Sequence, residues 1–303
     1  MSNEIVCCIC DKPVSPPYHI LGKRAYCAAH YATVNRHRDG AWRAGLIELI
    51  VLALFSGALL FLSNAMGEIS QTGRLVLGII LSVVPSALWL SYFYANDRLE
   101  PEPKKFVMLV FFVALALYEL LGRRLIEEWF HVSEWASYTS WVSLLAHMLI
   151  IGIVFQAIQY VAIRTVYSSR EFDERMDGIV YGTVAGLGLA TILNLRYVIG
   201  NDGVAIGPGV VTTVTNALAQ ASFGGLLGYV MSQAKFEHKP TLWVPLGFAI
   251  VALLNGLFVW LMREVSIVGL DVLFFRTFVL GLALAVVAFL LLQVLMRRAM
   301  KMG

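Results

Sequence analysis

Long apolar stretches alternate with short polar connections along most of the chain. Predominantly apolar stretches of roughly 20 residues occupy 45–65, 75–96, 105–122, 142–166, 177–199, 207–233, 241–262 and 270–296. A helix of that length crosses the hydrocarbon core of a bilayer and makes all its backbone hydrogen bonds internally. The pattern therefore predicts an all-α polytopic membrane protein, a bundle of about eight transmembrane helices.

Two of these stretches differ from the others in side-chain size and polarity. The stretch 177–199 is rich in small residues, namely Gly182, Ala185, Gly186, Gly188 and Ala190. The stretch 207–233 is the least apolar, since it carries Thr212, Thr213, Thr215, Asn216, Gln220 and Ser222. Small residues let helix backbones approach closely, and polar residues avoid lipid. We therefore expect both helices to pack in the middle of the bundle.

Composition agrees with the membrane interpretation. The 303 residues are 59% hydrophobic and 14% charged, whereas soluble domains carry about 25% charged residues. The net charge of +3 is too small to indicate a nucleic-acid partner. No cleavable signal peptide is expected, because the first apolar run begins only near Leu46, after a polar, Cys-rich segment.

The distribution of basic residues predicts the orientation. If the N-terminus is cytoplasmic, 17 of the 23 Lys and Arg residues lie on the cytoplasmic side and six on the other. Cytoplasmic loops carry the excess of Lys and Arg. We therefore expect both termini in the cytoplasm and the chain in the cytoplasmic membrane of a prokaryote, with the lipid bilayer as its obligatory surroundings.

The N-terminal segment 1–40 carries a metal-ligand pattern and forms a unit separate from the transmembrane domain, 41–303. Cys7-x-x-Cys10 is followed by Cys27-x-x-His30. Two such pairs wrap one tetrahedral Zn²⁺ in a structural role. Cys8 is an alternative ligand to Cys7, and His19 and His37 are weaker substitutes. The other interpretation is a set of free cysteines beside a chance histidine.

Six amide side chains are predicted at bilayer depth, in four different apolar stretches: Gln156, Gln159, Asn194, Asn216, Gln220 and Asn255. Polar residues there indicate a functional site by default. The alternative is that each amide joins two helices by a hydrogen bond. If all six converge, they line one polar cavity.

Acidic residues near the helix ends are interpreted as interfacial or ion-paired charges. Glu119 precedes Arg123 by four residues, the favourable order for a pair on one helix. Asp177 lies at the start of the stretch 177–199. Glu48 and Asp271 lie near the ends of the first and last stretches.

Three blocks resemble the PrsW-type intramembrane proteases. The segment from Asp97 to Lys104, DRLEPEPK, is similar to the family's D-R-x-E-P-E-P motif. Asp177-Gly-Ile-Val-Tyr-Gly182, running into Gly186-Leu-Gly-Leu-Ala190, is similar to its D-G-I-V-Y-G…G-L-G-F-A motif. Ala221-Ser-Phe-Gly-Gly225 is similar to the segment that follows its functional histidine. The resemblance covers about 97–230 and omits the N-terminal knuckle, the segment that holds Cys7, Cys10, Cys27 and His30. Gly22–Tyr31 instead resembles the second half of a LIM-type or treble-clef finger.

The resemblance implies an intramembrane endopeptidase, but the matched catalytic positions differ. Phe155 and Gln156, with Gln159, stand where the family has E-E-x-x-K. Leu193 replaces the glutamate before Asn194, and Gln220 replaces the histidine. Hydrolysis needs a group that activates water. We therefore predict an inactive relative that binds a membrane peptide or lipid-linked partner in a polar cavity.

Two alternatives stay open. One is an active endopeptidase with a divergent site, in which Glu119 or the Glu127–Glu128 pair supplies the carboxylate. The other is a transporter or channel, against which stands the lack of recognisable inverted repeats.

Overall fold

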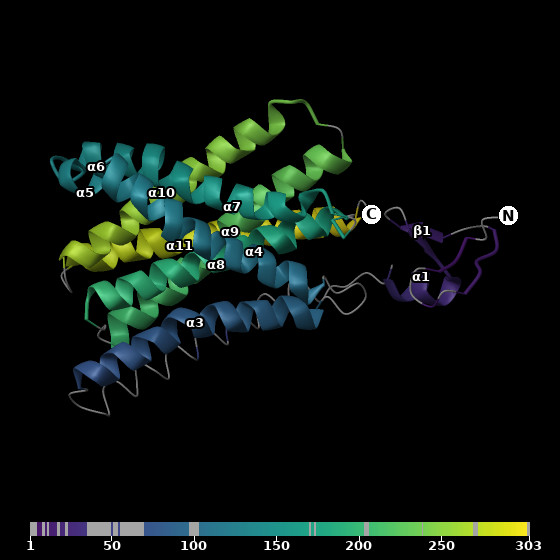
Figure 1. The fold of residues 1–303 in the computed structure, drawn as a ribbon, viewed down its shortest axis with the longest axis horizontal. Helices are drawn as coiled ribbons and strands as arrows, with labels where there is room; N and C mark the ends of the chain where they lie inside the picture. Colours follow the sequence, from purple (N-terminus) through teal and green to yellow (C-terminus); the bar gives the residue numbers. More distant parts are fainter. Residues whose placement is uncertain are drawn as a thin grey trace.

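A computed structural model places most of the transmembrane domain and the core of the N-terminal segment (Figure 1). It describes residues 5–7, 10, 12–16, 19–21, 24–34, 50, 54, 70–96, 103–169, 171–172, 174–202, 206–237, 239–268 and 272–301. The predicted first span, 45–65, and the motif residues 97–102 therefore lie almost wholly outside the described residues.

The transmembrane domain is a bundle of long helices that run alternately in opposite directions (Figure 1). In the described part of the chain, these helices are α3 (Gln71–Asn96), α4 (Lys104–Leu117), α7 (Gly152–Tyr167), α8 (Arg175–Gly200), α9 (Ile206–Phe236), α10 (Trp243–Val268) and α11 (Val272–Lys301). Short helical pieces extend two of them: η1 (Tyr118–Gly122) and η2 (Leu125–Trp129) follow α4, and α6 (Ser140–Ala146) and η3 (His147–Ile151) precede α7. The isolated turn α5 (Val132–Trp135) lies between the two sets.

The described helices agree closely with the predicted spans. Five stretches within the described residues are long and apolar enough to cross a membrane: Gln71–Leu88, Lys104–Trp129, Ser140–Tyr167, Arg175–Gly200 and Trp243–Arg263. A shorter apolar helix, Leu282–Met296, belongs to α11. The all-α membrane fold is confirmed, and the count of about eight spans stays a prediction.

The third span is longer than predicted, and its later part is π-helical. We expected it to end near residue 122, but η1 and η2 carry the helix to Trp129. A π-helical turn holds more residues than an α-helical turn and rotates the side chains that follow it onto another face. Sequence periodicity does not reveal such turns.

Helices α8 and α9 form the centre of the bundle, as the small and polar residues predicted. In the window Arg175–Gly200, 83% of the residues are buried. A Cβ added at Gly182 would meet the backbone carbonyl of Gly224, and one added at Gly224 would meet that of Gly182. Only glycine allows two helix backbones to approach this closely. The contact is therefore set by the absence of side chains on both helices.

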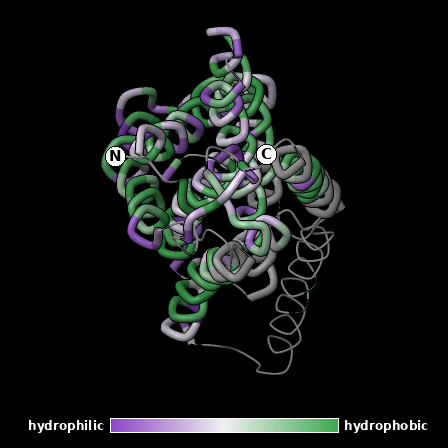
Figure 2. Tube along the Cα trace, turned by 90° about the vertical axis from the view of Figure 1, so that its right-hand side faces the viewer, coloured by the Kyte–Doolittle hydropathy of each residue, from purple (hydrophilic) through white to green (hydrophobic). Residues whose placement is uncertain are grey.

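Hydrophobic residues predominate along the described helices of the bundle (Figure 2). Large apolar side chains on the outer helices are exposed, among them Phe112, Leu120, Ile250 and Val287. Trp129, Tyr138 and Trp141, around the connection from η2 to α6, are each 76% exposed. Tryptophan and tyrosine are enriched where the hydrocarbon core meets water, so we place this connection at a membrane interface.

The N-terminal segment folds around a turn and a hairpin. Val6 pairs with Pro13 in an isolated bridge that closes the turn holding Cys7 and Cys10. Strands β1 (His19–Leu21) and β2 (Arg24–Tyr26) are antiparallel and lead into helix α1 (Ala28–Val34). Cys27 ends the hairpin and His30 lies in the first turn of α1. The treble-clef-like interpretation of this segment agrees with that order of elements.

Candidate functional site

Four of the six predicted amides form one hydrogen-bonded network across α7, α9 and α10. Gln159 Nε2 donates to Gln220 Oε1 over 3.0 Å, and Gln220 Nε2 donates to Asn255 Oδ1 over 2.8 Å. Asn255 Nδ2 donates to Gln156 Oε1 (3.3 Å) and to Gln220 Oε1 (3.1 Å). Gln156 Nε2 donates to the backbone carbonyl of Phe223, over 3.2 Å. The network therefore joins three helices at the middle of the bundle.

The four amides of this network have no contact with solvent or lipid. Gln156, Gln159, Gln220 and Asn255 are all 0% exposed. All four amide nitrogens donate at least one hydrogen bond and three of the four oxygens accept one, but Gln159 Oε1 is buried without a partner among the described residues. A buried amide that loses its hydrogen-bond partner destabilises the fold by the full desolvation free energy of that group. The network therefore favours one packing of these helices over others.

The remaining two amides, Asn194 and Asn216, form a separate pair between α8 and α9. Asn216 Nδ2 donates to Asn194 Oδ1 over 2.7 Å. Asn194 Nδ2 donates to the carbonyl of Thr213, over 3.0 Å. The structure thus distributes the predicted site residues between two hydrogen-bonded groups, and it does not place all six around one polar cavity.

A small cavity lies between α7, α8, α9 and α10 and has a volume of about 150 Å³. Most of its wall is apolar, formed by Phe155, Leu193, Phe258, Val259 and Met262. Thr212 and Asn216 of α9 complete it. Phe155 and Leu193 are the positions matched to two glutamates of the PrsW-type pattern. Sequence reasoning missed the three α10 residues, because an apolar side chain on a transmembrane helix looks the same whether it faces lipid or a cavity.

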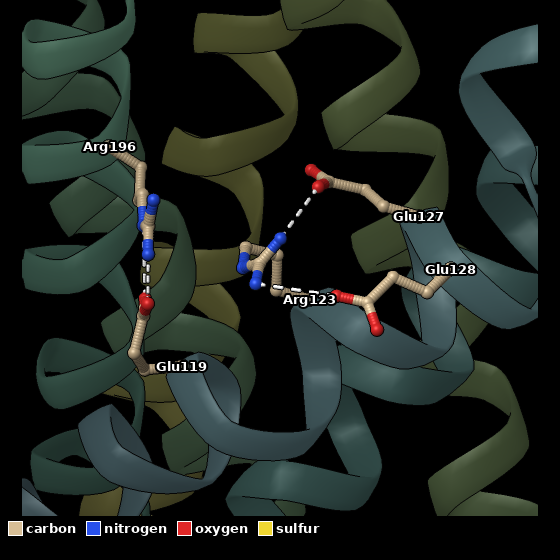
Figure 3. A network of polar contacts seen from close by, with 5 residues as sticks. All are labelled: Glu119, Arg123, Glu127, Glu128 and Arg196. Atoms are coloured by element: carbon tan, nitrogen blue, oxygen red, sulfur yellow. Dashed lines mark hydrogen bonds and ion pairs between the residues drawn. The ribbon is translucent and has the colours of Figure 1, made fainter.

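The acidic residues proposed as alternative carboxylates are in ion pairs near one end of the bundle (Figure 3). Glu119 of η1 pairs with Arg196 of α8, whose Nε and Nη2 donate to the two carboxylate oxygens. Arg123 instead contacts Glu127 (3.2 Å) and Glu128 (3.5 Å). The expected Glu119–Arg123 pair is therefore wrong. The π-helical turn at Tyr118–Gly122 explains the difference, because it changes which residues share a helix face.

Asp177, also predicted as an interfacial charge, has a structural role at the start of α8. Its Oδ2 accepts from the backbone N–H of Glu174 over 2.6 Å, and the Glu174 side chain caps the helix in return. This reciprocal capping box satisfies two backbone donors at the helix N-terminus. Glu48 and Asp271 lie outside the described residues.

At the N-terminus, the ligand atoms of Cys7, Cys10, Cys27 and His30 lie within 4.8 Å of one another. His30 Nδ1 is 3.5 Å from Cys7 Sγ and 3.2 Å from Cys27 Sγ. Tetrahedral zinc with ordinary bond lengths separates sulfur and nitrogen ligands by about 3.5 Å. The four residues therefore form a group that could hold a metal ion. Cys8 lies outside the described residues.

The electrostatics of the thiol cluster depend on its close packing. The backbone N–H of Lys12 lowers the pKa of the Cys10 thiol, whereas desolvation and the neighbouring sulfurs of Cys7 and Cys27 raise it, and the net shift is upward. Crowded thiols resist losing several protons, because thiolates repel one another. A divalent cation at the centre would reverse this resistance, since it stabilises coordinating thiolates.

Together these features define a polytopic helical membrane protein with amide side chains at its core and a separate Cys₃His group. A model of the PrsW family, described as intramembrane metalloproteases, matches residues 102–292, and the chain belongs to this family. It is 26% identical to the Protease PrsW of Bacillus subtilis (strain 168) over 188 residues, which cover 61% of this chain and 82% of that protein. It is 31% identical to the Protease PrsW of Geobacillus kaustophilus over 195 residues, 59% of this chain and 77% of that protein. No solved structure matches the chain.

The described residues of the matched region do not fit a catalytic metal. Among the residues that the structure describes, the only group of three or more His, Cys, Asp or Glu side chains close enough to share an ion is the N-terminal one, outside residues 102–292. The polar groups at the core of the bundle are the amides of the network, and amides are poor ligands for transition metals.

Proposed function

We propose that this chain is a non-hydrolytic member of the PrsW family that binds a membrane peptide or lipid-linked partner within its bundle. The observation that carries the proposal is that the matched catalytic positions hold Phe155, Gln156, Gln159, Leu193 and Gln220. None of these side chains can act as a general base or nucleophile. The buried network supports it further, because its amides bond to one another instead of facing an open, water-filled site.

The experiment is a cleavage assay with the purified full chain and a model transmembrane substrate. We expect no product, whereas an active PrsW-family protease in the same assay serves as positive control. Cleavage that disappears in the Gln156→Ala or Gln220→Ala variant would overturn the proposal. Chelators are a poor test by themselves, because they would also remove a metal from the N-terminal knuckle.

The alternative hypothesis, an active endopeptidase with a divergent catalytic site, predicts a different result in the same assay. It requires a carboxylate from Glu119, Glu127 or Glu128, and those residues are ion-paired and partly exposed at the end of the bundle. Cleavage that survives Gln220→Ala but is lost in Glu119→Gln would support the alternative.

We further propose that the N-terminal knuckle binds one structural Zn²⁺ on the cytoplasmic side. Four protein ligands leave no open position for water, so the metal would stabilise the fold and take no part in catalysis. So small a segment has little core, and metal binding would supply most of its folding free energy.

Metal analysis of the purified full chain tests this proposal. We expect about one zinc per chain, lost in Cys27→Ser and Cys7→Ser but kept in Cys8→Ser, the matched control in the same sequence segment. Zinc that is kept in Cys7→Ser and lost in Cys8→Ser would assign the ligand to Cys8. Metal-free protein with reduced thiols would contradict the proposal.

A further inference from the structure

The N-terminal knuckle exposes large apolar side chains outside the membrane-spanning helices. Ile20 on β1 is 59% exposed, and Ile5 and Val6, beside the first pair of ligands, are 40% and 45% exposed. A single apolar side chain on a surface needs no explanation, but several on so small a unit indicate a contact surface. The backbone pairing of the knuckle shows how two of these side chains are presented.

The hairpin presents one apolar face outward. His19 pairs with Tyr26 across the two strands. Tyr26 is fully buried, and the His19 ring stacks on Tyr31 of α1 with the ring centroids 4.4 Å apart. The next pair is Ile20 with Ala25. Because successive side chains point to opposite faces of a strand, Ile20 and Ala25 lie on the face of the hairpin that is turned away from α1.

The turn that holds Cys7 and Cys10 presents a second apolar point. Its isolated bridge pairs Val6 with Pro13, and backbone hydrogen bonds of 2.8 Å flank the pair on both sides. Val6 and Pro13 are therefore a non-hydrogen-bonded pair, the kind in which opposite side chains lie closest together. Both are exposed, and so is Lys12, the neighbour of Pro13.

Basic residues accompany these apolar points in the sequence. Lys12 precedes Pro13, and Lys23 and Arg24 follow Ile20 within four residues. Segment 1–43 as a whole carries six Lys and Arg residues against three Asp and Glu residues. Apolar side chains accompanied by cations fit a bilayer surface, where hydrocarbon lies beneath a layer of anionic headgroups.

The position of the knuckle in the chain favours the bilayer as its partner. Helix α1 ends at Val34, and the first predicted span begins at residue 45, so ten residues, 35–44, connect them. Ten residues reach at most about 35 Å when fully extended. The knuckle therefore stays close to a membrane surface, which a short connection presents to it at a high effective concentration. The charge and the tether together select anionic lipid over a freely diffusing protein.

Resting on the proposed zinc knuckle, but not on whether the bundle is hydrolytic, we propose that the knuckle docks on the anionic surface of the bilayer. Ile20 and Val6 enter the interfacial layer, and Lys12 lies among the phospholipid headgroups. The docked knuckle holds its Cys₃His group against the membrane at a fixed depth. The knuckle is thus a membrane-binding module as well as a metal-binding one.

The test uses the full chain in lipid nanodiscs, one copy per disc, with an environment-sensitive fluorescent amino acid in place of Ile20 or of Val6. Phospholipids brominated in their acyl chains quench the fluorophore only on contact. We expect several-fold stronger quenching in discs that contain phosphatidylglycerol than in discs of phosphatidylcholine alone, and a loss of the difference at high salt. The matched control carries the fluorophore at Ala32, an exposed residue of α1, on the other side of the hairpin from Ile20, and should be quenched little in either disc.

Variants separate the contributions of charge and apolar contact. Lys12→Gln should weaken the docking equilibrium about fivefold, the usual effect of one basic residue near an anionic membrane, and Lys12→Arg should restore it. With the fluorophore at position 6, Ile20→Ser should lower quenching several-fold, whereas Ile20→Leu should keep it. The zinc content of each sample shows that the variant has kept its fold.

The outcomes separate docking from zinc binding. A zinc-loaded chain in which positions 6 and 20 are quenched no more than position 32, or equally in neutral and anionic discs, overturns the docking inference and leaves the zinc proposal in place. A blue shift that needs no lipid and grows with chain concentration in detergent would show that a second copy covers this surface, and it also overturns docking. A metal-free chain that is still quenched overturns the zinc proposal alone, and a metal-free chain without quenching overturns both.

Discussion

At the scale of single residues, the buried amides decide much of what this bundle can do. A carboxylate or histidine at the position of Gln220 could exchange protons, whereas an amide can only donate and accept hydrogen bonds. Gln220 contacts Gln159 and Asn255 at the same time, so it is the centre of the network. Its replacement would leave groups on two other helices unpaired.

We expect Gln220→Leu to lower the free energy of unfolding by roughly 1–3 kcal/mol, because it strands buried polar groups on α7 and α10. The matched control is Ser222→Ala, two residues along the same helix. Ser222 bonds only to the carbonyl of Leu218 in its own helix, so its loss should cost less. Unfolding in detergent, followed by circular dichroism, measures both. Equal effects of the two variants would show that the network contributes nothing beyond helix contacts.

The ion pair between Glu119 and Arg196 should contribute little to stability. The two side chains are 33% and 45% exposed, and exposed pairs contribute at most about 1 kcal/mol. We therefore expect Glu119→Gln to change the unfolding midpoint only slightly. A large loss of stability would show that the pair is shielded by lipid or by residues outside those described. The same variant also serves in the cleavage assay.

At the scale of elements, the closest contact in the bundle is the crossing of α8 and α9. Glycines at matching positions bring the two backbones together, and the amide side chains of α9 form hydrogen bonds to α7, α8 and α10. The apolar surfaces of the outer helices face lipid, where hydrophobicity gives no preference for one helix neighbour over another. Close packing and hydrogen bonds therefore specify the arrangement.

Gly182→Ala tests this crossing. The added methyl would meet the carbonyl of Gly224, a backbone group that can move only with its helix. We expect a loss of about 1–3 kcal/mol or a failure to assemble. Gly200→Ala is the control, because a Cβ there meets nothing within 4 Å. Yield of monodisperse protein and the unfolding midpoint are the measurements, and indistinguishable variants would contradict the packing argument.

At the scale of the whole molecule, the orientation of the bundle in the membrane determines on which side the N-terminal knuckle lies. Basic residues gather at the ends where α4, α8 and α10 begin, with Lys104, Arg175 and Lys239 among them. The exposed aromatic residues Trp129, Tyr138 and Trp141 lie at the opposite ends of the neighbouring helices. The charge distribution predicts that the basic end is cytoplasmic.

Labelling of intact cells with a membrane-impermeant maleimide tests this orientation. A cysteine introduced at Tyr138, which is 76% exposed, should react from outside. Cys8, the native thiol outside the proposed zinc site, should react only after the membrane is opened, and it provides the internal control. Labelling of the native thiols in intact cells would reverse the orientation and place the knuckle outside.

Several properties could be predicted from the sequence because they depend on neighbours along the chain. Helix positions follow from the length of apolar runs, and the Cys₃His group follows from two local pairs of ligands, Cys7 with Cys10 and Cys27 with His30. The burial of α8 and α9 followed from residue size and polarity alone. The family followed from motifs within continuous segments.

Only the tertiary structure decided which distant residues meet. The separation of Asn194 and Asn216 from the other amides depends on the crossing of helices far apart in the sequence. The partner of Glu119 depends on a π-helical turn, and the cavity depends on which face α10 presents to α7 and α9. The lengths of apolar stretches identify membrane helices but do not show which helices pack against one another, because lipid solvates apolar side chains as well as a neighbouring helix does. The sequence alone therefore determined a membrane bundle with a metal-ligand knuckle, and the packing of its helices decided the network and the cavity.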